Sequence, residues 1–409
     1  MERFFNDPHT IARKRSGRLG PCLDRLAQHF ANFGYRRLYG RRQLQLAAEF
    51  GQWLERHRVP LAQVGSEHPT WFLRERYRSK ARHLGDGAFF PPLRDILIRD
   101  GVIVPTGETV RNPVKTLLEE FALYLRQERR LAATTTERYA AFVEDWLMDR
   151  FGEGPANLSA VSAAEIVGYV RRRAPTVARK TAKLMVSALR SFLGYAHYRG
   201  YIKLDLAIGI PPVADWTSTS IPRGLPAQDV RRVLQRCNRR SSTGRRDYAI
   251  LLLLARLGLR AHEIAGLTLD DIDWENGLVT VRGKGGVHQL PLPPDVGKAI
   301  ATYLKSRRPC AQSRKIFLRG VAPVMPFKRP GSIGTVVRHA LRRAKINSVR
   351  KGSHQFRHTW ATEMLRRGAS RAEIAELLRH RNVQTTTIYA KVDLASLRTL
   401  AVPWPGGSR

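Results

Sequence analysis

An apolar run at residues 250–255 places the strongest constraint on how this chain can fold. The run lies within the segment GRRDYAILLLLARLG, which is apolar on nearly every side of a helix and ends at Gly258. A helix without a polar face has to be covered all round, so the segment predicts a large core with other elements packed around it. The run is far too short to cross a bilayer, for which a helix needs about 20 apolar residues.

The pattern changes from helical to extended after this helix. Turn sequences at residues 275–277 and 283–286 separate short segments that are typical of antiparallel strands. Helical periodicity then returns and dominates to the end of the chain. We therefore predict a mainly α fold with a small antiparallel β-sheet in its C-terminal domain.

The length of 409 residues exceeds that of most single domains, so two or three domains are expected. Residues 1–108 carry helical patterns with basic clusters and end in a linker-like stretch at residues 104–107. Residues 109–215 contain four or five amphipathic helices. A stretch rich in Pro, Ser and Thr at residues 211–226 then separates them from residues 216–409, the C-terminal domain.

Several local signals predict where helices begin and end. Ser162 and Glu165 are spaced as a capping box, and Gly200 is placed to end a long helix. Residues 134–136, all Thr, offer an N-cap, and the Gly and Pro residues at 85–92 indicate a loop. An amphipathic helix following an arginine cluster is predicted from the spacing of Leu44, Leu46, Phe50, Trp53 and Leu54.

The first two domains share a pattern that indicates an internal repeat. Residues 61–76 align without gaps on residues 158–173, matching apolar positions as well as arginines. Upstream, Trp53 and Trp146 sit in similar apolar patterns in the same order. The competing interpretation is that two amphipathic helices with arginine-rich ends look alike without common origin.

The charge of the chain predicts a polyanionic partner. Lys and Arg total 71 against 34 acidic residues, a formal net charge of +37. Nucleic acid is the first interpretation, because arginine is spread over every segment. An anionic membrane surface is the second, and no basic amphipathic helix supports it. The three scattered cysteines argue against disulfides and a cysteine metal site, and with an N-terminus unlike a signal peptide they favour a reducing cytoplasm.

Residues 351–391 bring together side chains that make little sense as core packing. His354 and Arg357 stand three apart in a helical segment, so they share one face. His380 follows an apolar run, and Tyr389 lies in a short Thr-rich segment. Two imidazoles, a guanidinium and a phenol fit around a phosphate group, with the phenol as nucleophile.

A zinc site is the competing interpretation of the same stretch. His354 and His358 are four apart, the spacing of a helical zinc pair, but Gln355 stands where the metalloprotease motif needs Glu. No third ligand is evident. We therefore favour phosphate binding, expect no metal, and interpret His358 as structural or DNA-facing.

The segments HQFRHTWAT and LLRHRNVQTTTIYAKV resemble the tyrosine recombinases, the phage-integrase-like enzymes. GLRAHEIAGL, with Arg260 and Glu263, and VRGKGGVHQLPLP, with Lys284 at a hairpin tip, resemble two further boxes of that family. Arg379 is a departure, since the family often has glycine there. The resemblance covers roughly residues 111–400. The catalytic set that it implies is Arg260, Lys284, His354, Arg357, His380 and Tyr389, with Glu263 in support.

The resemblance also implies how these residues act. Tyr389 would attack a DNA phosphodiester to form a 3′-phosphotyrosyl link and release a 5′-hydroxyl. Arg260 and Arg357 would clamp the phosphate, and His380 would hydrogen-bond it. Lys284 would protonate the leaving oxygen, and His354 would assist proton transfer. The covalent link conserves the bond energy, so the reaction is expected to need no cofactor.

The implied function is site-specific recombination or integration of a mobile element. The partner would be double-stranded DNA with inverted-repeat core sites, and two strand exchanges would pass through a Holliday junction in a homotetramer. The free chain would be a monomer or weak oligomer in the cytoplasm, associated with the nucleoid when bound to DNA; a need for accessory proteins stays open. No membrane partner is expected.

Residues 109–215 resemble the family's helical core-binding domain, which is SAM-like. The candidate DNA-binding residues there are Arg171, Arg172, Arg173, Arg179, Lys180 and Lys183. For residues 1–108 we expect a second, helical DNA-binding unit related to it by duplication, with a tetramer-building domain as the alternative.

The sequence is also compatible with two other functions. A type IB topoisomerase would use the same covalent chemistry but rejoin the original strand as a monomer. A non-catalytic DNA-binding protein of the same fold would lack the chemistry altogether. The core-binding domain ahead of the catalytic one favours the recombinase over the first, and the intact set of six residues argues against the second.

Overall fold

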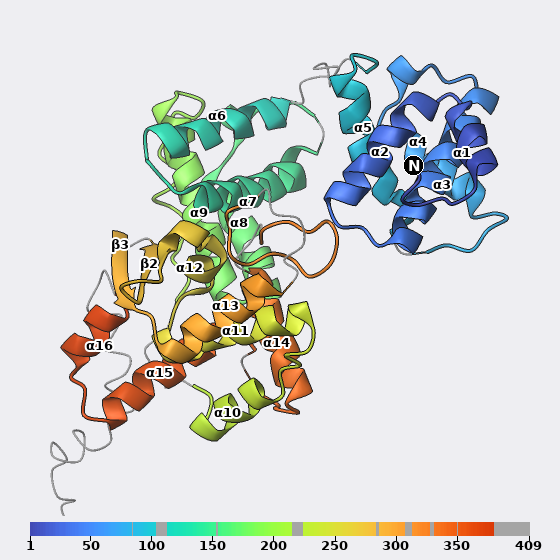
Figure 1. Ribbon diagram of the computed structural model, residues 1–409. Coiled ribbons are helices and arrows are strands. Elements are labelled where there is room, and N and C mark those ends of the chain that lie inside the picture. Colours follow the sequence, from blue (N-terminus) through green and yellow to red (C-terminus); the bar gives the residue numbers. More distant parts are fainter. Residues whose placement is uncertain are drawn as a thin grey trace, which may run out of the picture. The chain divides into compact units, whose positions relative to one another are not determined.

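The computed structural model describes residues 1–83, 85–103, 113–152, 154–214, 224–283, 286–306, 313–327, 331–349 and 351–379 (Figure 1). These residues are mainly helical and form one three-stranded antiparallel sheet, as predicted. The chain divides into two compact units. One contains Met1–Val104 and Ser220–Arg409, and the other contains Pro105–Thr219.

The N-terminal segment folds around its own apolar cluster. Its elements are α1 (Pro8–Arg15), α2 (Gly20–Asn32), α3 (Arg37–Arg56), the 3-10 helix η1 (Leu61–Gln63), α4 (His68–Arg76), η2 (Asp86–Phe89) and α5 (Phe90–Arg99). The helix predicted from the apolar spacing is α3, and its predicted core positions are all buried.

The loop expected at residues 85–92 is wrong in part. Gly85 does adopt a left-handed turn, with φ of 90°, but Pro91 and Pro92 lie in the first turn of α5. Proline fits there because the first helical residues have no intrahelical partner for their N–H groups. The two prolines therefore start a helix and do not mark a loop.

The second unit is a helical domain. Its elements are α6 (Pro113–Gln127), α7 (Ala133–Phe151), η3 (Leu158–Ala160), α8 (Ala163–Arg173), η4 (Ala174–Thr176) and α9 (Arg179–Tyr198). The predicted capping box is confirmed: the Glu165 amide donates to the Ser162 hydroxyl, and the Ser162 amide donates to the Glu165 carboxylate. Gly200 follows α9 with φ of 77°, so the predicted helix end is also confirmed.

The predicted threonine cap of α7 is wrong. The backbone is extended at Ala132, which takes the N-cap position without a side-chain hydrogen bond. Residues 134–136 therefore lie inside the first turns of the helix, and Thr136 is buried. From there a threonine hydroxyl cannot accept the amide hydrogen bonds that an N-cap accepts.

The two helical segments run through the same order of elements. Each has two helices, a 3-10 helix, a helix, a second 3-10 helix and a closing helix: α2 to α5 in the first, and α6 to α9 in the second. Val64 and Val161 both follow their 3-10 helix in extended conformation and are buried. Trp53 and Trp146 are buried in the preceding helices. The aligned residues thus occupy corresponding places in the two segments.

The C-terminal segment carries the sheet. Its elements are α10 (Ala227–Gln235), α11 (Ser242–Leu257), α12 (Ala261–Gly266), η6 (Leu269–Asp271), β1 (Ile272–Asp273), β2 (Leu278–Gly283), β3 (Gly286–Pro291), α13 (Pro294–Lys305), α14 (Gly331–Arg343), α15 (His354–Arg366) and α16 (Arg371–Leu377). The strand order is β1-β2-β3, with Val279 opposite both Ile272 and Leu290.

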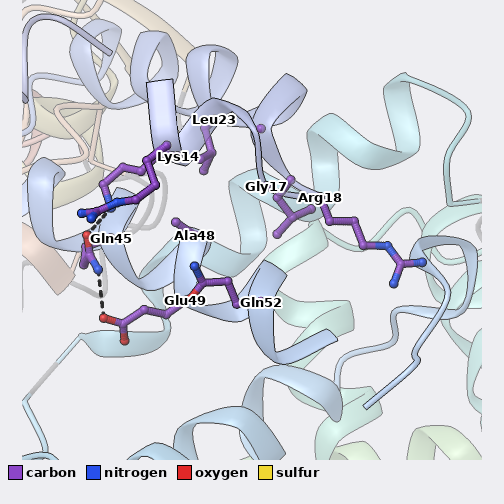
Figure 2. A pocket seen from close by; sticks show the side chains of 11 residues that line it. Lys14, Gly17, Arg18, Leu23, Gln45, Ala48, Glu49 and Gln52 are labelled. Carbon is purple, nitrogen blue, oxygen red and sulfur yellow. Dashed lines mark hydrogen bonds between the residues drawn. The ribbon is translucent and has the colours of Figure 1, made fainter. Parts of the chain in front are cut away.

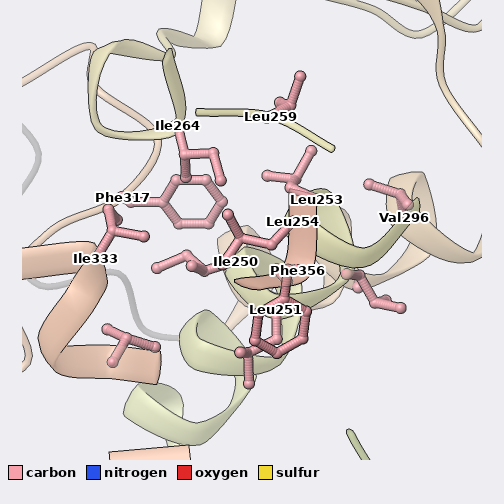
Figure 3. Close-up of a cluster of buried hydrophobic side chains, with 14 of the residues drawn as sticks. Ile250, Leu251, Leu253, Leu254, Leu259, Ile264, Val296, Phe317, Ile333 and Phe356 are labelled. Carbon is pink, nitrogen blue, oxygen red and sulfur yellow. The ribbon is translucent and has the colours of Figure 1, made fainter. Parts of the chain in front are cut away.

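The predicted central helix is α11. Residues 249–254 are all buried, in a cluster to which α12, β2, α13, α14 and α15 also contribute (Figure 3). Gly258 ends α11 in the left-handed conformation, with φ of 56°. The helix and its end are therefore confirmed.

Candidate active site

The core fixes the backbone on either side of the candidate catalytic residues. Phe356 of α15, Ile264 of α12 and Leu259, which precedes α12, lie in the buried cluster around α11 (Figure 3). Arg357 follows Phe356 in sequence, and Arg260 follows Leu259. Burial of the apolar neighbours therefore fixes the backbone positions of the two arginines.

Arg357 is a buried arginine held by main-chain carbonyls. Its Nη1 donates to the carbonyl of Gly258 over 2.6 Å, and its Nη2 donates to the carbonyl of Leu378. Gly258 and Leu378 are the C-caps of α11 and α16. Carbonyls at helix C-termini carry partial negative charge, so they stabilise a buried guanidinium.

Gly258 cannot readily be replaced at this junction. Its left-handed φ disfavours a side chain, and a Cβ there would lie 3.2 Å from Cδ2 of Leu378 and 3.5 Å from the Trp360 ring. The absent side chain thus allows the end of α11 to approach α15 and α16.

Arg260 lies at the N-cap of α12 and is partly open to solvent, with 24% of its side chain exposed. Its Nη1 donates to Oε1 of Glu263 over 2.9 Å, and its Nη2 donates to the carbonyl of Arg379 over 3.2 Å. A guanidinium that is oriented by protein hydrogen bonds and still partly exposed to solvent is suited to hold an anion.

Glu263 is the buried counter-charge of this site. Burial alone would raise its pKa, but the hydrogen bond from the Arg260 amide and the charges of Arg379 and Arg260 outweigh it. The pKa of Glu263 therefore lies below its ordinary value, and the side chain is ionised at neutral pH. The predicted supporting role has a physical basis: Glu263 contacts both the backbone and the side chain of Arg260.

His354 and Arg357 lie one turn apart at the start of α15, as the spacing predicted. His354 is exposed and Arg357 is buried. Gln355 accepts a hydrogen bond from Ser348 over 2.6 Å and is buried, so it holds the loop before the helix. The rings of His354 and His358 have centroids 6.3 Å apart. Within the described ranges no cluster of three His, Cys, Asp or Glu side chains could hold a metal.

Three of the predicted catalytic residues, Lys284, His380 and Tyr389, lie outside the described residues. Their neighbours are nevertheless informative. Gly283, which precedes Lys284, ends β2 beside the site: a Cβ there would lie 3.1 Å from Oε1 of Glu263. Arg379, which precedes His380, contacts Arg260 and Glu263.

The six candidate DNA-binding residues of the second unit are all exposed. Arg171, Arg172 and Arg173 end α8, and the other three lie in the first turns of α9. Arg172 pairs with Asp149 over 3.1 Å and Arg173 with Asp145 over 2.9 Å. Exposed ion pairs of this kind contribute little free energy, so both arginines remain available to an anionic ligand.

A separate cavity of about 130 Å³ lies in the N-terminal segment (Figure 2). Its buried Lys14 donates to Gln45, which donates to Glu49. Burial lowers the pKa of Lys14. Lys14, Gln45 and Glu49 thus form a chain of hydrogen bonds along the cavity, and no residue that lines it belongs to the predicted catalytic set.

Comparisons with known proteins identify the family. The model of the phage integrase family matches residues 223–395, and that of the phage integrase N-terminal SAM-like domain matches residues 118–200. The inferred integrase/recombinase y4rA of Sinorhizobium fredii (strain NBRC 101917 / NGR234) is 43% identical over 99% of both chains. The chain is a member of the tyrosine recombinase family. The tyrosine recombinase XerA of Thermococcus onnurineus (strain NA1) is 31% identical over 70% of this recombinase and 94% of its own length.

Solved structures support the fold of this recombinase. XerH site-specific recombinase, bound to palindromic difH substrate in a post-cleavage complex, matches with a TM-score of 0.55 at 16% identity. The match covers 73% of the recombinase and 98% of XerH. A lambda integrase dimer bound to a COC' core site matches with a TM-score of 0.51 at 16% identity, over 67% and 94% of the two chains.

The family predicted from the sequence is thus confirmed, as are the mainly α fold and the class of enzyme: a tyrosine-type DNA strand transferase. No helix in the described part of the recombinase combines the length and apolar character needed to cross a membrane.

Sequence reasoning missed the contacts that Arg379 makes with Arg260 and Glu263. From the sequence, Arg379 is notable only because it stands where the family often has glycine, before His380. Instead, α16 ends at Leu377, and Arg379 itself takes a left-handed conformation, with φ of 54°. The available signal was the arginine at a glycine position, which becomes meaningful once Glu263 is seen beside it.

Proposed function

We propose that the recombinase cleaves and rejoins DNA at specific sites through a 3′-phosphotyrosyl intermediate on Tyr389. One observation carries the proposal: Arg260 and Arg357, far apart in sequence, are hydrogen-bonded to the adjacent carbonyls of Arg379 and Leu378. Both guanidiniums thus lie at the chain segment that leads into His380 and Tyr389. Paired guanidiniums suit a phosphodiester under attack by a phenol.

The proposed chemistry is a displacement at phosphorus. The phenol oxygen of Tyr389 attacks the scissile phosphate, and the bond from phosphorus to the 5′-oxygen breaks. The phenol proton leaves with the help of His354, and Lys284 gives a proton to the departing 5′-oxygen. Arg260 and Arg357 stabilise the charge on the non-bridging oxygens, and His380 hydrogen-bonds the phosphate.

The second half of the reaction reverses the first on a new partner. A 5′-hydroxyl from the other duplex attacks the phosphotyrosyl bond, releases Tyr389 and joins the exchanged strands. Two such exchanges pass through a Holliday junction held by a tetramer on inverted-repeat core sites. Full-length similarity to an inferred integrase/recombinase supports strand exchange between two sites.

Tyr389→Phe tests the nucleophile. The variant is expected to lose covalent attachment to a nicked suicide substrate and to bind DNA with nearly unchanged affinity, because only one oxygen is removed from a chain with many phosphate-binding cations. Tyr198→Phe, at an exposed tyrosine of α9, is the matched control and should form adduct normally. A protease-sensitive adduct from Tyr389→Phe would disprove the assignment.

We also propose the division of DNA binding between the first two segments. Residues 109–215 act as the core-binding domain, and the SAM-like match at residues 118–200 supports this. Residues 1–108 act as a second DNA-binding unit of common origin. The shared order of elements, including both 3-10 helices, supports duplication.

A further inference from the structure

Arg379 occupies a backbone conformation that costs a non-glycine residue free energy. Among the described residues, those outside glycine with positive φ are Arg58, Arg130, Lys345 and Arg379. The first three are exposed, whereas Arg379 is only 7% exposed. A left-handed conformation is unfavourable for a residue with a side chain, and a buried guanidinium needs compensating partners. The contacts of Arg379 should therefore repay both costs.

Two of these contacts lead to Arg260, the candidate phosphate-binding arginine. Nη2 of Arg379 donates to Oε2 of Glu263 over 3.1 Å, and Nη1 donates to the carbonyl of Leu377 over 3.1 Å. The carbonyl of Arg379 accepts from Nη2 of Arg260 over 3.2 Å. Arg379 thus reaches Arg260 twice, once through its own main chain and once through Glu263.

The charges show why a side chain here matters. Without Arg379, Glu263 and Arg260 would form a neutral pair, and the carboxylate would cancel the charge meant for a phosphate. With Arg379, two guanidiniums share one carboxylate, and the cluster keeps a net positive charge. The charged groups that act on Glu263 are Arg260 and Arg379. Gly283 lies beside this cluster, since a Cβ there would be 3.1 Å from Oε1 of Glu263 and 3.5 Å from Nε2 of the titratable His262, and Lys284 follows Gly283 in sequence.

We propose that Arg379 is a positioning residue: it neutralises and orients Glu263, so that Arg260 keeps both its direction and its charge for the scissile phosphate. This inference rests on the proposed role of Arg260. It explains why an arginine stands where the family often has glycine: the left-handed backbone position is kept, and the side chain adds a cation beside Glu263.

Arg379→Gly is the informative variant, because glycine accepts the left-handed backbone and removes only the side chain. The rate of covalent cleavage at saturating DNA is expected to fall by about tenfold or more, since small misplacements of a catalytic group cost up to about 100-fold. The dissociation constant for DNA should change by less than about twofold, because one buried cation adds little to the counterion release that governs affinity. Lys345→Gly, which relieves the same backbone strain at an exposed residue, is the matched control and should cleave normally.

The pH dependence separates positioning from a purely structural role. In Arg379→Gly, Glu263 loses one of the charges that lower its pKa, so the acid limb of the cleavage rate should move to higher pH. Arg379→Lys keeps the charge and should restore the acid limb and part of the rate. A variant that loses thermal stability but keeps the wild-type acid limb, with no recovery by Arg379→Lys, would show that the side chain is only structural.

A crystal structure of Arg379→Gly makes the inference testable without the reaction. We expect the Arg260 guanidinium to leave its present position; the 2.9 Å bond to Glu263 and the 3.2 Å bond to residue 379 both remaining would overturn the proposal. Absence of any adduct from the wild-type protein would instead count against the proposed function. The two failures are thus distinguishable.

Discussion

Glu263 is the carboxylate that pairs with both Arg260 and Arg379. Glu263→Gln keeps its shape and leaves two arginines facing a neutral group. Removing one partner of a buried ion pair costs about 3–5 kcal/mol, so the melting temperature at pH 7 should drop substantially. Thr335→Ala, at an exposed hydroxyl bonded within α14, is a control that should change little.

The same variant gives a pH test with a definite sign. Because the folded state depresses the pKa of Glu263 below its ordinary 4.5, its contribution is present above that pH and is lost as pH falls through the folded pKa. The stability gap between wild type and Glu263→Gln should therefore narrow below about pH 4.5. Thermal melts across that range measure it, and a constant gap would contradict the assignment of the charge.

Lys284 is predicted to act by giving a proton to the leaving 5′-oxygen. Lys284→Ala should cleave ordinary DNA very slowly but cleave a substrate with sulfur at the 5′-bridging position far better, because sulfur leaves without protonation. Lys298→Ala on the exposed side of α13 serves as control. Equal defects on the two substrates would refute general-acid catalysis.

At the scale of elements, the end of α11 sets the position of Arg357. Gly258→Ala forces a side chain into a left-handed residue and against Leu378, which moves the carbonyl that Arg357 binds. Gly200→Ala, after α9, meets the same backbone cost of roughly 1–2 kcal/mol with open space around it. Both variants should lose stability, but only Gly258→Ala should lose cleavage. Equal cleavage by the two variants would show that this helix end does not position the arginine.

The elements that the sequence predicted well are those governed by local rules. The apolar run of α11, the capping box at Ser162 and the glycine helix ends follow from neighbours within a few residues. The predicted cap at residues 134–136 failed because α7 begins before them, at Ala133, and Thr136 is buried against the rest of the domain. The role of Arg379 could not be predicted, because its partner Glu263 lies in another element and meets it only in the folded chain.

At the scale of the whole molecule, the net charge of +37 predicts binding that is strongly weakened by salt. Each phosphate contact adds about 0.9 to the slope of log affinity against log salt on duplex DNA. Replacing Arg179, Lys180 and Lys183 by Ala should reduce that slope by up to about 3. An unchanged slope would exclude the start of α9 from the DNA interface.

The proposal for residues 1–108 gives the last prediction. Arg74 and Arg171 hold equivalent places in the two aligned segments and both are exposed. If both segments bind DNA, Arg74→Glu and Arg171→Glu should each weaken binding by repelling phosphate, and each should shorten protection in a different part of the footprint. Glu67→Gln, at the exposed N-cap of α4, is the control: it changes the surface of the same segment without repelling phosphate and should not shorten the footprint.

Deletion of residues 1–108 decides between the two roles considered for that domain. A second DNA-binding unit requires that the remaining chain protect fewer base pairs and bind more weakly, with a smaller salt slope, because phosphate contacts have been lost. A tetramer-building domain requires the opposite pattern: footprint and affinity stay the same while assembly on paired sites fails. The shortened chain keeps the buried clusters of the second and C-terminal segments. Because residues 1–104 share a compact unit with the C-terminal segment, a thermal melt of the shortened chain is the control that it still folds.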